Sequence, residues 1–474
     1  MSFTSVTYFL FVGISLLIYT IVPKRAKWCV LLGASAVYYV MAAGLRTLWL
    51  GAATPIVNGG GLLLGHLNDQ GKARRKAAAD KEEKKQIRKK YDAKKRAVVT
   101  VAVLGVFGLL IALKYVNFLG ESAYGIAGLF GRKSAYQPVQ ILLPLGISYY
   151  TLCAVSYVVD VYRGKYKPER NFFKLALFLS FFPQMTEGPI GKYEIMMPRL
   201  VEGHSFNFER DAQAVMRIFW GMFKKMVIAD RANLFVTGVF DNGDQAGSMV
   251  LLGTLLYTVQ IYCEFSGCMD IVCATGQLFG VEMQENFRRP IFSKTINEFW
   301  QRWHITLGAW IKEYVFFSVS LSKGLMNLSK HTRKKLNDYF ANLVPMTFAL
   351  FCVWFFNGIW HGASWKYVLY GLYYYILMMI GMYLRPVSDK LLHALHIAPE
   401  SKGFALFQMV RTFLIVNVGM MLFRCHTISQ WGQSLARIFT DFDGACLTNG
   451  TVLSLGNDWQ DFLIMGIGVL VVGI

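Results

Sequence analysis

Charged residues are scarce in this chain of 474 residues: only 16% are Asp, Glu, Lys or Arg, whereas 54% are hydrophobic. Soluble domains usually carry about 25% charged residues. The shortage argues against a soluble domain, and long apolar runs are typical of a protein that crosses a membrane several times. We therefore expect the fold class of an all-α polytopic membrane protein.

Cysteine pairs and nucleotide-binding motifs are also missing. The eight cysteines include no CxxC pair and lie mostly in apolar runs, which indicates small buried hydrophobic residues rather than a disulfide framework. The sequence contains no GxxxxGK[ST], GxSxG or dinucleotide-binding fingerprint. We expect no bound cofactor, and the spacing of His and carboxylate residues gives no signal for a metal site.

Several apolar runs are too short for the roughly 20 residues that cross a bilayer core. Examples are 172–182, 249–262 and 311–321. Such runs predict re-entrant or broken helices, which are tolerated where they are buried in protein or line a cavity. The first run, 3–22, lacks a basic start and a cleavage site, so it is predicted to be a retained span. The last run, 462–474, predicts a helix that only partly enters the membrane or is cut short.

Positive charge is concentrated in residues 72–96, which carry 13 Lys or Arg and 4 Asp or Glu within a chain of net charge +20. A nucleic-acid patch, a lipid-facing amphipathic segment and a cytoplasmic loop are all compatible with this density. Its place between apolar spans favours a cytoplasmic loop, with the N-terminus outside, and its Ala, Lys and Glu content favours a solvated helix. The predicted organisation is 1–70 as N-terminal membrane helices, 71–97 as the basic cytoplasmic segment, and 98–474 as the core with C-terminal helices.

One histidine stands inside a strongly apolar region. His361 follows the run 344–356 and precedes the run 367–384, neither of which contains a charged residue. Histidine can take or give a proton near neutral pH. An ionisable group at bilayer depth is costly and marks a functional site by default. His361 is therefore the first candidate for a proton carrier, as a catalyst, a relay or a buried structural group.

Two further segments carry polar residues in apolar surroundings. Gln184 and Glu187 lie in the proline-broken stretch 181–190, which lines a polar space or forms an interfacial loop. Glu264 and Asp270 adjoin apolar runs and need partners if they are buried; Arg288 and Arg289 are the expected partners. An ion-paired scaffold is the favoured interpretation of these two carboxylates.

A second histidine lies in an aromatic segment. On a helix, Trp300, Trp303 and His304 would share one face, with Arg302 nearby. A histidine beside aromatic residues is often a satisfied structural group, so catalytic and structural roles both stay open. The HxxH pair at 393 and 396 has no acid nearby and is predicted to be exposed.

Taken together, these motifs resemble the membrane-bound O-acyltransferase (MBOAT) family over roughly 143–370. The resemblance rests on seven segments in order: LPLGISYYT, DVYRG, FFPQ…GPI, FSG…D, NFRRP, FWQRWH and NGIWHG. They are more similar to the bacterial alginate-type O-acetylation branch than to the D-alanyl branch of teichoic-acid modification. The chain departs from the family pattern at Glu187, where a small residue is usual, and at Cys268, where an aromatic is usual.

The resemblance implies an MBOAT-type multi-helix core around a tunnel or funnel, and a catalytic role for His361 with His304 as its companion. His361 would act as a general base on an acceptor hydroxyl that attacks an acyl thioester, and His304, Asn357 or a backbone N–H would orient it or stabilise the oxyanion. Tunnel-lining or supporting roles are expected for Asn357, Trp360, Trp303, Arg302, Gln184, Glu187, Glu264 and Asp270.

The resemblance also implies the reaction partners. The acyl donor would be a cytoplasmic thioester, acetyl-CoA or an acyl carrier protein, both acidic and suited to a basic inner face. An extracytoplasmic acetyltransferase would finish the transfer to a cell-surface polysaccharide, membrane lipid would surround the chain, and no nucleic acid is expected. Two alternatives stay open: D-alanyl transfer to teichoic acid, and a membrane transporter with buried histidines, although inverted repeats are not evident in the sequence.

Overall fold

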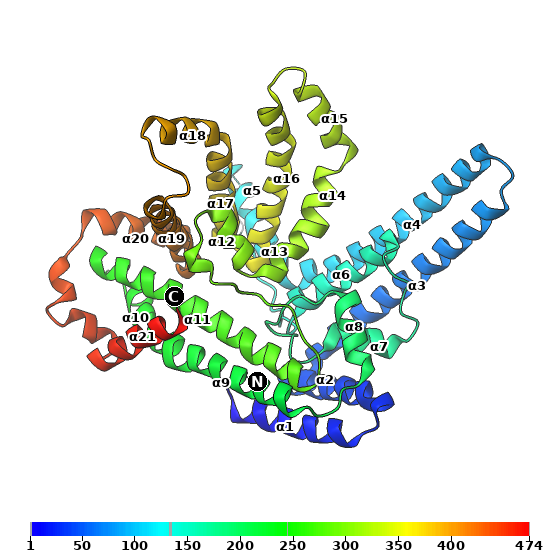
Figure 1. Cartoon of the computed structure of the whole chain (residues 1–474), viewed down its shortest axis with the longest axis horizontal. Helices are drawn as coiled ribbons and strands as arrows, with labels where there is room; N and C mark the ends of the chain where they lie inside the picture. The colour runs from blue at the N-terminus through cyan, green and yellow to red at the C-terminus, as the bar shows by residue number, and fades with distance from the viewer. Residues whose placement is uncertain (1, 132–134, 244, 474) are drawn as a thin grey trace. The chain divides into compact units, whose positions relative to one another are not determined.

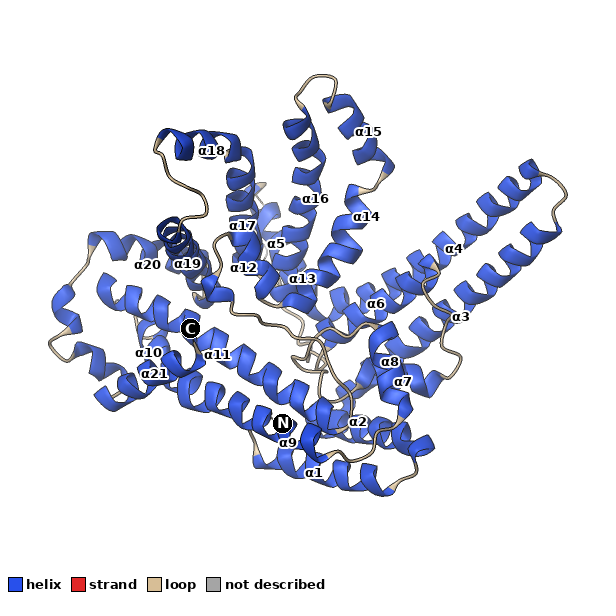
Figure 2. Ribbon diagram, in the orientation of Figure 1, coloured by secondary structure: helices blue, strands red, loops and turns tan. Residues whose placement is uncertain are grey.

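The computed structural model describes residues 2–131, 135–243 and 245–473, and these residues are helical with no β-strand (Figure 2). Five helical stretches among them are long and apolar enough to cross a membrane, or six if the bent pair α17 (Trp365–Tyr383) and α18 (Arg385–Ala394) is one span. The five stretches are Lys24–Ala77, Lys81–Leu129, Gly247–Leu278, Asp338–His361 and Lys402–Arg424. The expectation of an all-α, multi-pass membrane protein is confirmed.

The chain divides into two compact units, which we describe separately: residues 1–217 with 272–284, and residues 218–271 with 285–474. The division predicted from sequence rests on motifs and charge, and it stays a prediction. The helices that begin in the first unit are α1 (Val6–Ile21), α2 (Lys27–Ala43), α3 (Leu48–Ala77), α4 (Lys81–Leu110), α5 (Val116–Leu129), α6 (Ile147–Arg163), α7 (Phe172–Ser180), α8 (Tyr193–Glu202) and α9 (Phe208–Met222).

The second unit carries most of the remaining helices, and α11 contributes its last residues to the first unit. These helices are α10 (Asp230–Asp241), α11 (Gly247–Leu278), α12 (Ile296–Arg302), α13 (Ile305–Ile311), α14 (Phe317–Ser320), α15 (Lys323–Thr332), α16 (Asp338–His361), α17 (Trp365–Tyr383), α18 (Arg385–Ala394), α19 (Lys402–Arg424), α20 (Ile428–Thr440) and α21 (Trp459–Val472). Three π-helical turns join neighbouring helices: η3 (Ile111–Tyr115), η4 (Phe223–Ala229) and η6 (Lys312–Phe316).

The basic segment forms the far end of a long antiparallel hairpin of α3 and α4 (Figure 1). Asp80 caps α4, since its side chain accepts a hydrogen bond from the Glu83 N–H at 2.6 Å. Exposed side chains then pair along the helix, as Lys85 does with Glu82 at 3.5 Å. The predicted solvated helix is confirmed for 81–96, whereas residues 72–77 end α3 and the non-helical residues 78–80 separate the two parts. The cytoplasmic side of the segment stays a prediction.

Two breaks in the first unit follow from particular residues. Gly146 precedes α6 with a φ of +67°, and a side chain there would overlap the carbonyl oxygen of Met185, so both the backbone angle and the close approach require glycine. No helix covers 181–192, between α7 and α8, which confirms the break expected from Pro183 and Pro189. Within it Gln184 is buried and its Nε2 donates to the Phe178 carbonyl at 3.3 Å, whereas Glu187 is exposed.

The hydrophobic core of the second unit is rich in aromatic rings. Trp303 lies in it, stacked on Phe299 at 5.5 Å between ring centroids and edge-on to Phe287 at 5.1 Å. A neighbouring cluster is built from Trp354, Tyr370 and Tyr374. These rigid rings surround the ends of α12 and α16, where both candidate histidines are found.

Candidate functional site

Both candidate histidines stand at helix ends in the second unit. His361 is the last residue of α16, and His304 occupies the junction between α12 and α13. The Trp360 ring contacts both imidazoles, with centroid distances of 5.6 Å to His304 and 5.0 Å to His361. The structure therefore brings together the two histidines that the sequence singled out, with Trp360 against each of them.

His361 is enclosed by aromatic rings. Tyr370 and Phe423 approach its imidazole edge-on, at 5.8 and 5.3 Å between centroids. Asn357 lies one helical turn before it on the same face of α16 and is only 5% exposed. No hydrogen bond joins the Asn357 side chain to any residue that the structure describes. The Asn357 amide atoms keep some accessible surface and offer both a donor and an acceptor, so Asn357 is suited to bind a substrate atom beside His361.

Close packing of α16 on α17 fixes the position of His361. Gly358 and Gly371 face each other at the crossing, and a side chain on Gly371 would overlap the carbonyl oxygen of Trp354. Small residues allow two helix backbones to approach this closely, as is common within membranes. The crossing lies about one helical turn before His361, so it fixes the position of the His361 backbone relative to α17.

The prediction that Trp303 and His304 lie on one helix with Trp300 is wrong. Helix α12 ends at Arg302, Trp303 is extended, and His304 takes the left-handed conformation with a φ of 49°. The cause is a distant segment that holds the backbone here. Asn286 accepts hydrogen bonds from the Ile305 N–H to its carbonyl, at 3.0 Å, and from the Thr306 N–H and hydroxyl to its Oδ1, at 3.0 and 2.7 Å.

His304 combines backbone strain with an unsatisfied polar atom. The left-handed conformation costs a non-glycine residue about 1–2 kcal/mol. Its Nδ1 is buried and has no hydrogen-bond partner among the described residues. Burial, reinforced by the nearby His361 imidazole, lowers the pKa of His304 to about 3, so it is neutral near pH 7. Strain and a missing partner in one residue are typical of functional sites.

The other predicted site residues have structural contacts. Arg302 pairs with Glu298 at 2.5 Å and donates to the Arg289 carbonyl at 3.4 Å. Glu264 pairs with Lys225 at 2.8 Å, and Asp270 pairs with Lys224 at 2.5 Å.

The prediction that Arg288 and Arg289 pair with these two carboxylates is therefore wrong. The reason is that the π-helical turn η4 directs two consecutive lysines, Lys224 and Lys225, at the same stretch of α11. Lys224 is 5% exposed and also donates to the Ser266 hydroxyl at 3.0 Å. Glu264 and Asp270 are thus ion-paired, as the sequence predicted, but their partners are lysines and not arginines. Gln184 and Glu187 belong to the first unit and stay predictions.

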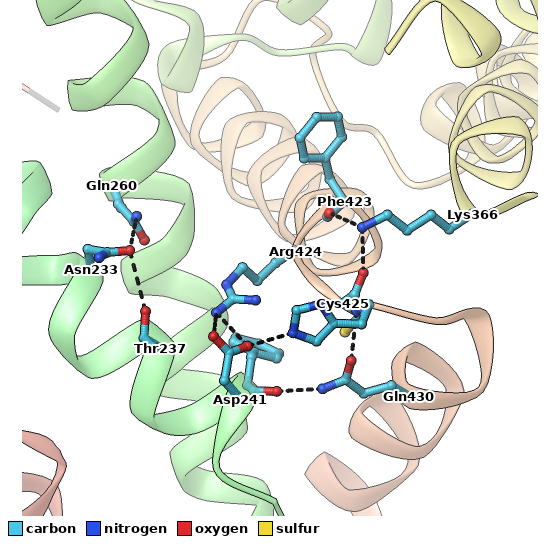
Figure 3. Close-up of polar contacts among 11 residues, drawn as sticks. Asn233, Thr237, Asp241, Gln260, Lys366, Phe423, Arg424, Cys425 and Gln430 are labelled. Carbon is cyan, nitrogen blue, oxygen red and sulfur yellow. Dashed lines mark hydrogen bonds and ion pairs between the residues drawn. The ribbon is translucent and has the colours of Figure 1, made fainter. Parts of the chain in front are cut away.

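A polar network surrounds the end of α19, which carries Phe423, one of the rings that contact His361 (Figure 3). The Lys366 ammonium donates to the carbonyls of Phe423, at 3.2 Å, and Cys425, at 2.7 Å, at the end of α19. Between these two residues, Arg424 binds both carboxylate oxygens of Asp241 on α10 at 2.9 Å. The Arg424 guanidinium holds the pKa of the Asp241 carboxyl below its usual value, and His426 adds to this. The network fixes the last turn of α19 and with it the Phe423 ring.

Sequence reasoning missed several of these residues. Asn286 is the first residue of the NFRRP motif, in which the sequence predicted a role only for the charged residues Arg288 and Arg289. Phe265, which contacts His304 at 4.9 Å between centroids, stands in the FSG motif. No sequence pattern indicates a role for Lys366 or Phe423, because their contacts form only where α17 packs against α19.

Comparisons with known proteins agree with the resemblance. Residues 169–332, which include His304, match the family model of the membrane-bound O-acyltransferases. The chain is 30% identical over 343 residues to the probable alginate O-acetylase of Azotobacter vinelandii, covering 72% of this chain and 62% of that protein. It is 29% identical to the peptidoglycan O-acetyltransferase of Helicobacter pylori, covering 61% of this chain and 56% of that one.

A third relative is the teichoic acid D-alanyltransferase of Bacillus subtilis, 26% identical over 61% of this chain and 70% of that protein. The chain spans less than two thirds of the length of the alginate relatives that it matches. The family match, the relatives and the all-helical membrane fold agree with one another. Residues 169–332 therefore match the family model of the membrane-bound O-acyltransferases, and the chain around them is similar to bacterial enzymes that transfer acyl groups.

Proposed function

We propose that the chain is a membrane-embedded O-acyltransferase that moves an acetyl group from a cytoplasmic thioester toward an extracytoplasmic cell-surface polysaccharide. The observation that carries the proposal is the pair of histidines, His304 and His361, packed against one tryptophan inside a helical membrane protein. The alginate and peptidoglycan relatives support the reaction class and the kind of acceptor.

His361 acts as the general base. Its imidazole takes the proton of the acceptor hydroxyl while the hydroxyl oxygen forms a bond to the thioester carbonyl carbon. The tetrahedral intermediate then collapses, the carbon–sulfur bond breaks, and the leaving thiolate takes the proton back from the imidazolium. One acceptor O–H and one thioester are consumed, and one ester and one thiol are formed.

His304 is a positioning group rather than a base. Burial, reinforced by the nearby His361 imidazole, holds the pKa of His304 well below its usual value, which favours a neutral side chain that acts by hydrogen bonding. A neutral imidazole still offers one N–H donor and one nitrogen acceptor. With the Asn357 amide it can hydrogen-bond the acceptor hydroxyl or the developing oxyanion.

The donor is acetyl-CoA or an acyl carrier thioester, and no cofactor or metal is required. Both donors are acidic, which suits a chain with a basic segment at 72–96 on the cytoplasmic side. An extracytoplasmic acetyltransferase partner receives the acetyl group and completes its transfer. The localisation is a bacterial inner or plasma membrane, with the N-terminus outside.

D-alanyl transfer is the second candidate, favoured by the similarity to the Bacillus subtilis enzyme. One experiment separates the two. The full chain is produced, with its neighbouring genes, in a host without surface O-acetylation, and ester-linked acetyl and D-alanyl groups are released by mild base and quantified. We expect acetate to rise. A rise in D-alanine alone would replace the acetyl proposal, and no rise in either ester would contradict both.

Asn286 gives a test of the strained junction. Asn286→Ala removes both hydrogen bonds to the Asn286 Oδ1, each worth about 0.5–1.5 kcal/mol, and lets His304 leave its left-handed conformation. We expect the rate of acetyl transfer to fall by about tenfold, which corresponds to about 1.4 kcal/mol, while the protein still inserts and folds. The measurement is acetyl release from thioester donor in reconstituted membranes.

Asn297→Ala is the matched control, because Asn297 is an exposed residue of α12. It should keep the parental rate. If Asn286→Ala also keeps that rate, the junction does not position His304 for the reaction. If the variant loses folded protein in proportion to its activity, Asn286 is structural only.

A further inference from the structure

The first unit contains a cavity of about 500 Å³ that no step of the acyl transfer uses. It lies among α1, the segment 204–206 that follows α8, the start of α9 and Leu278 near the end of α11. Apolar side chains form most of its wall, among them Leu16, Val215 and Met216. A cavity with this lining favours an alkyl chain over a polar ligand, because each buried CH₂ contributes about 0.8 kcal/mol.

Cations gather at the polar side of this cavity. Arg210 lines it, and Lys27 donates from its Nζ to the carbonyl of the lining residue His204 at 2.6 Å. The same ammonium lies over the ring of Tyr19, 4.6 Å from its centroid. Lys27 is close enough to Lys24 and Arg210 for their charges to act on it. Three like charges in this small space repel one another.

Only one of these cations has a carboxylate partner among the described residues. Arg210 binds Asp211, with nitrogen–oxygen distances of 2.7 and 2.8 Å. Lys27 is 5% exposed, and its only hydrogen-bond acceptor in the described chain is the His204 carbonyl, although an ammonium has three donors. A buried ammonium without a counter-charge is costly. Asp211 also lines the cavity and neutralises Arg210, so Lys24 and Lys27 leave a net positive charge there. The arrangement is complementary to an anion.

Exposed aromatic rings surround the cavity. Phe206 and Phe208, both lining residues, are 69% and 78% exposed, and Phe219 further along α9 is 65% exposed. An amphipathic helix with exposed aromatic rings and nearby basic residues is typical of the bilayer interface. The candidate span that begins at Lys24 starts at the same place.

We propose that this cavity binds one anionic phospholipid, with an acyl chain along Val215 and Met216 and the phosphate beside Lys27 and Arg210. The apolar wall selects a lipid over a free phosphate. The Lys27 ammonium, which has no carboxylate partner among the described residues, selects an anionic headgroup over a zwitterionic one. The site lies wholly in the first unit and does not depend on the acyl-transfer proposal.

The experiment measures thermal unfolding of the full chain in nanodiscs of phosphatidylcholine alone and of phosphatidylcholine with phosphatidylglycerol. We expect phosphatidylglycerol to raise Tm by about 2–4 °C. Val215→Trp fills the cavity and should abolish this shift, whereas Phe219→Trp, on the same helix outside the cavity, should keep it. Lys27→Met should abolish the shift and Lys27→Arg should restore it, while Lys89→Met, on the exposed hairpin, is the charge control.

Native mass spectrometry of the detergent-purified protein gives a second measurement. One phosphatidylglycerol should stay bound to the parent and be lost from Val215→Trp. An equal shift in all variants would overturn the proposal, because it would report a general effect of surface charge. Inorganic phosphate that stabilises the protein equally in phosphatidylcholine discs would overturn the lipid as occupant. If Lys27→Met does not fold, Val215→Trp decides the result, since Val215 is 43% exposed.

Discussion

Replacing His361 by alanine is expected to lower the rate of acetyl transfer by about 10²–10⁴-fold, the usual contribution of a positioned general base. The variant removes the only group we assign to take the acceptor proton, and it leaves the helix crossing at Gly358 and Gly371 intact. The protein should therefore insert and unfold at nearly the parental temperature. The rate is measured as acetyl release from thioester donor, and in cells as surface O-acetyl groups.

Two further variants make this result specific. His361→Gln keeps a hydrogen-bonding side chain but cannot carry the proton, so it should be about as slow as the alanine variant. His393→Ala changes an exposed histidine of α18 and should be as fast as the parent. Normal acetylation by folded His361→Ala protein would remove His361 from the mechanism, and a parental rate for His361→Gln would assign it a hydrogen-bonding role instead.

A single methyl group at Gly371 is expected to be the most damaging small change to stability. Gly371→Ala would drive the new methyl into the Trp354 carbonyl, and because this neighbour is backbone, α16 and α17 must separate. Overpacking of this kind costs about 1–3 kcal/mol or more. We expect a lower Tm in detergent, less folded protein after purification, and a loss of activity larger than the loss of folded protein, because His361 moves with α16.

Gly381→Ala is the matched control on the same helix. A side chain at Gly381 meets no atom within 4 Å, so the same substitution should keep or raise Tm, as alanine favours helix by about 1 kcal/mol. Equal losses in both variants would mean that helix α17 tolerates no side chain at either glycine and that the crossing has no special role. No loss in Gly371→Ala would contradict the packing of α16 on α17.

Much of the fold could be predicted from local sequence. Apolar runs predict long helices such as α16 and α19, but the run 249–262, expected to be too short to cross a membrane, belongs to the 32-residue helix α11. The Ala, Lys and Glu content of 72–96 predicts a solvated helix, and Pro183 and Pro189 predict the break between α7 and α8. Each of these depends on residues close together in the chain. The same holds for His361, because the uncharged runs around it are adjacent to it in sequence.

The parts that could not be predicted depend on distant contacts. Helical periodicity predicts His304 on a helix face, but the hydrogen bonds that Ile305 and Thr306 donate to Asn286 outweigh the local helix preference there. No local pattern links Lys224 and Lys225 to Glu264 and Asp270, because the π-helical turn η4 directs these lysines at a helix about forty residues further along the chain. Lys366 acts on His361 only through the end of α19, which follows it by more than fifty residues.

The backbone at residue 304 also limits how this protein could be made more stable. Glycine or asparagine would suit the left-handed conformation better than histidine does. A search for stabilising substitutions would therefore favour replacing His304, and the same change would remove an imidazole from the reaction site. At this position selection for stability and selection for activity act on one side chain in opposite directions.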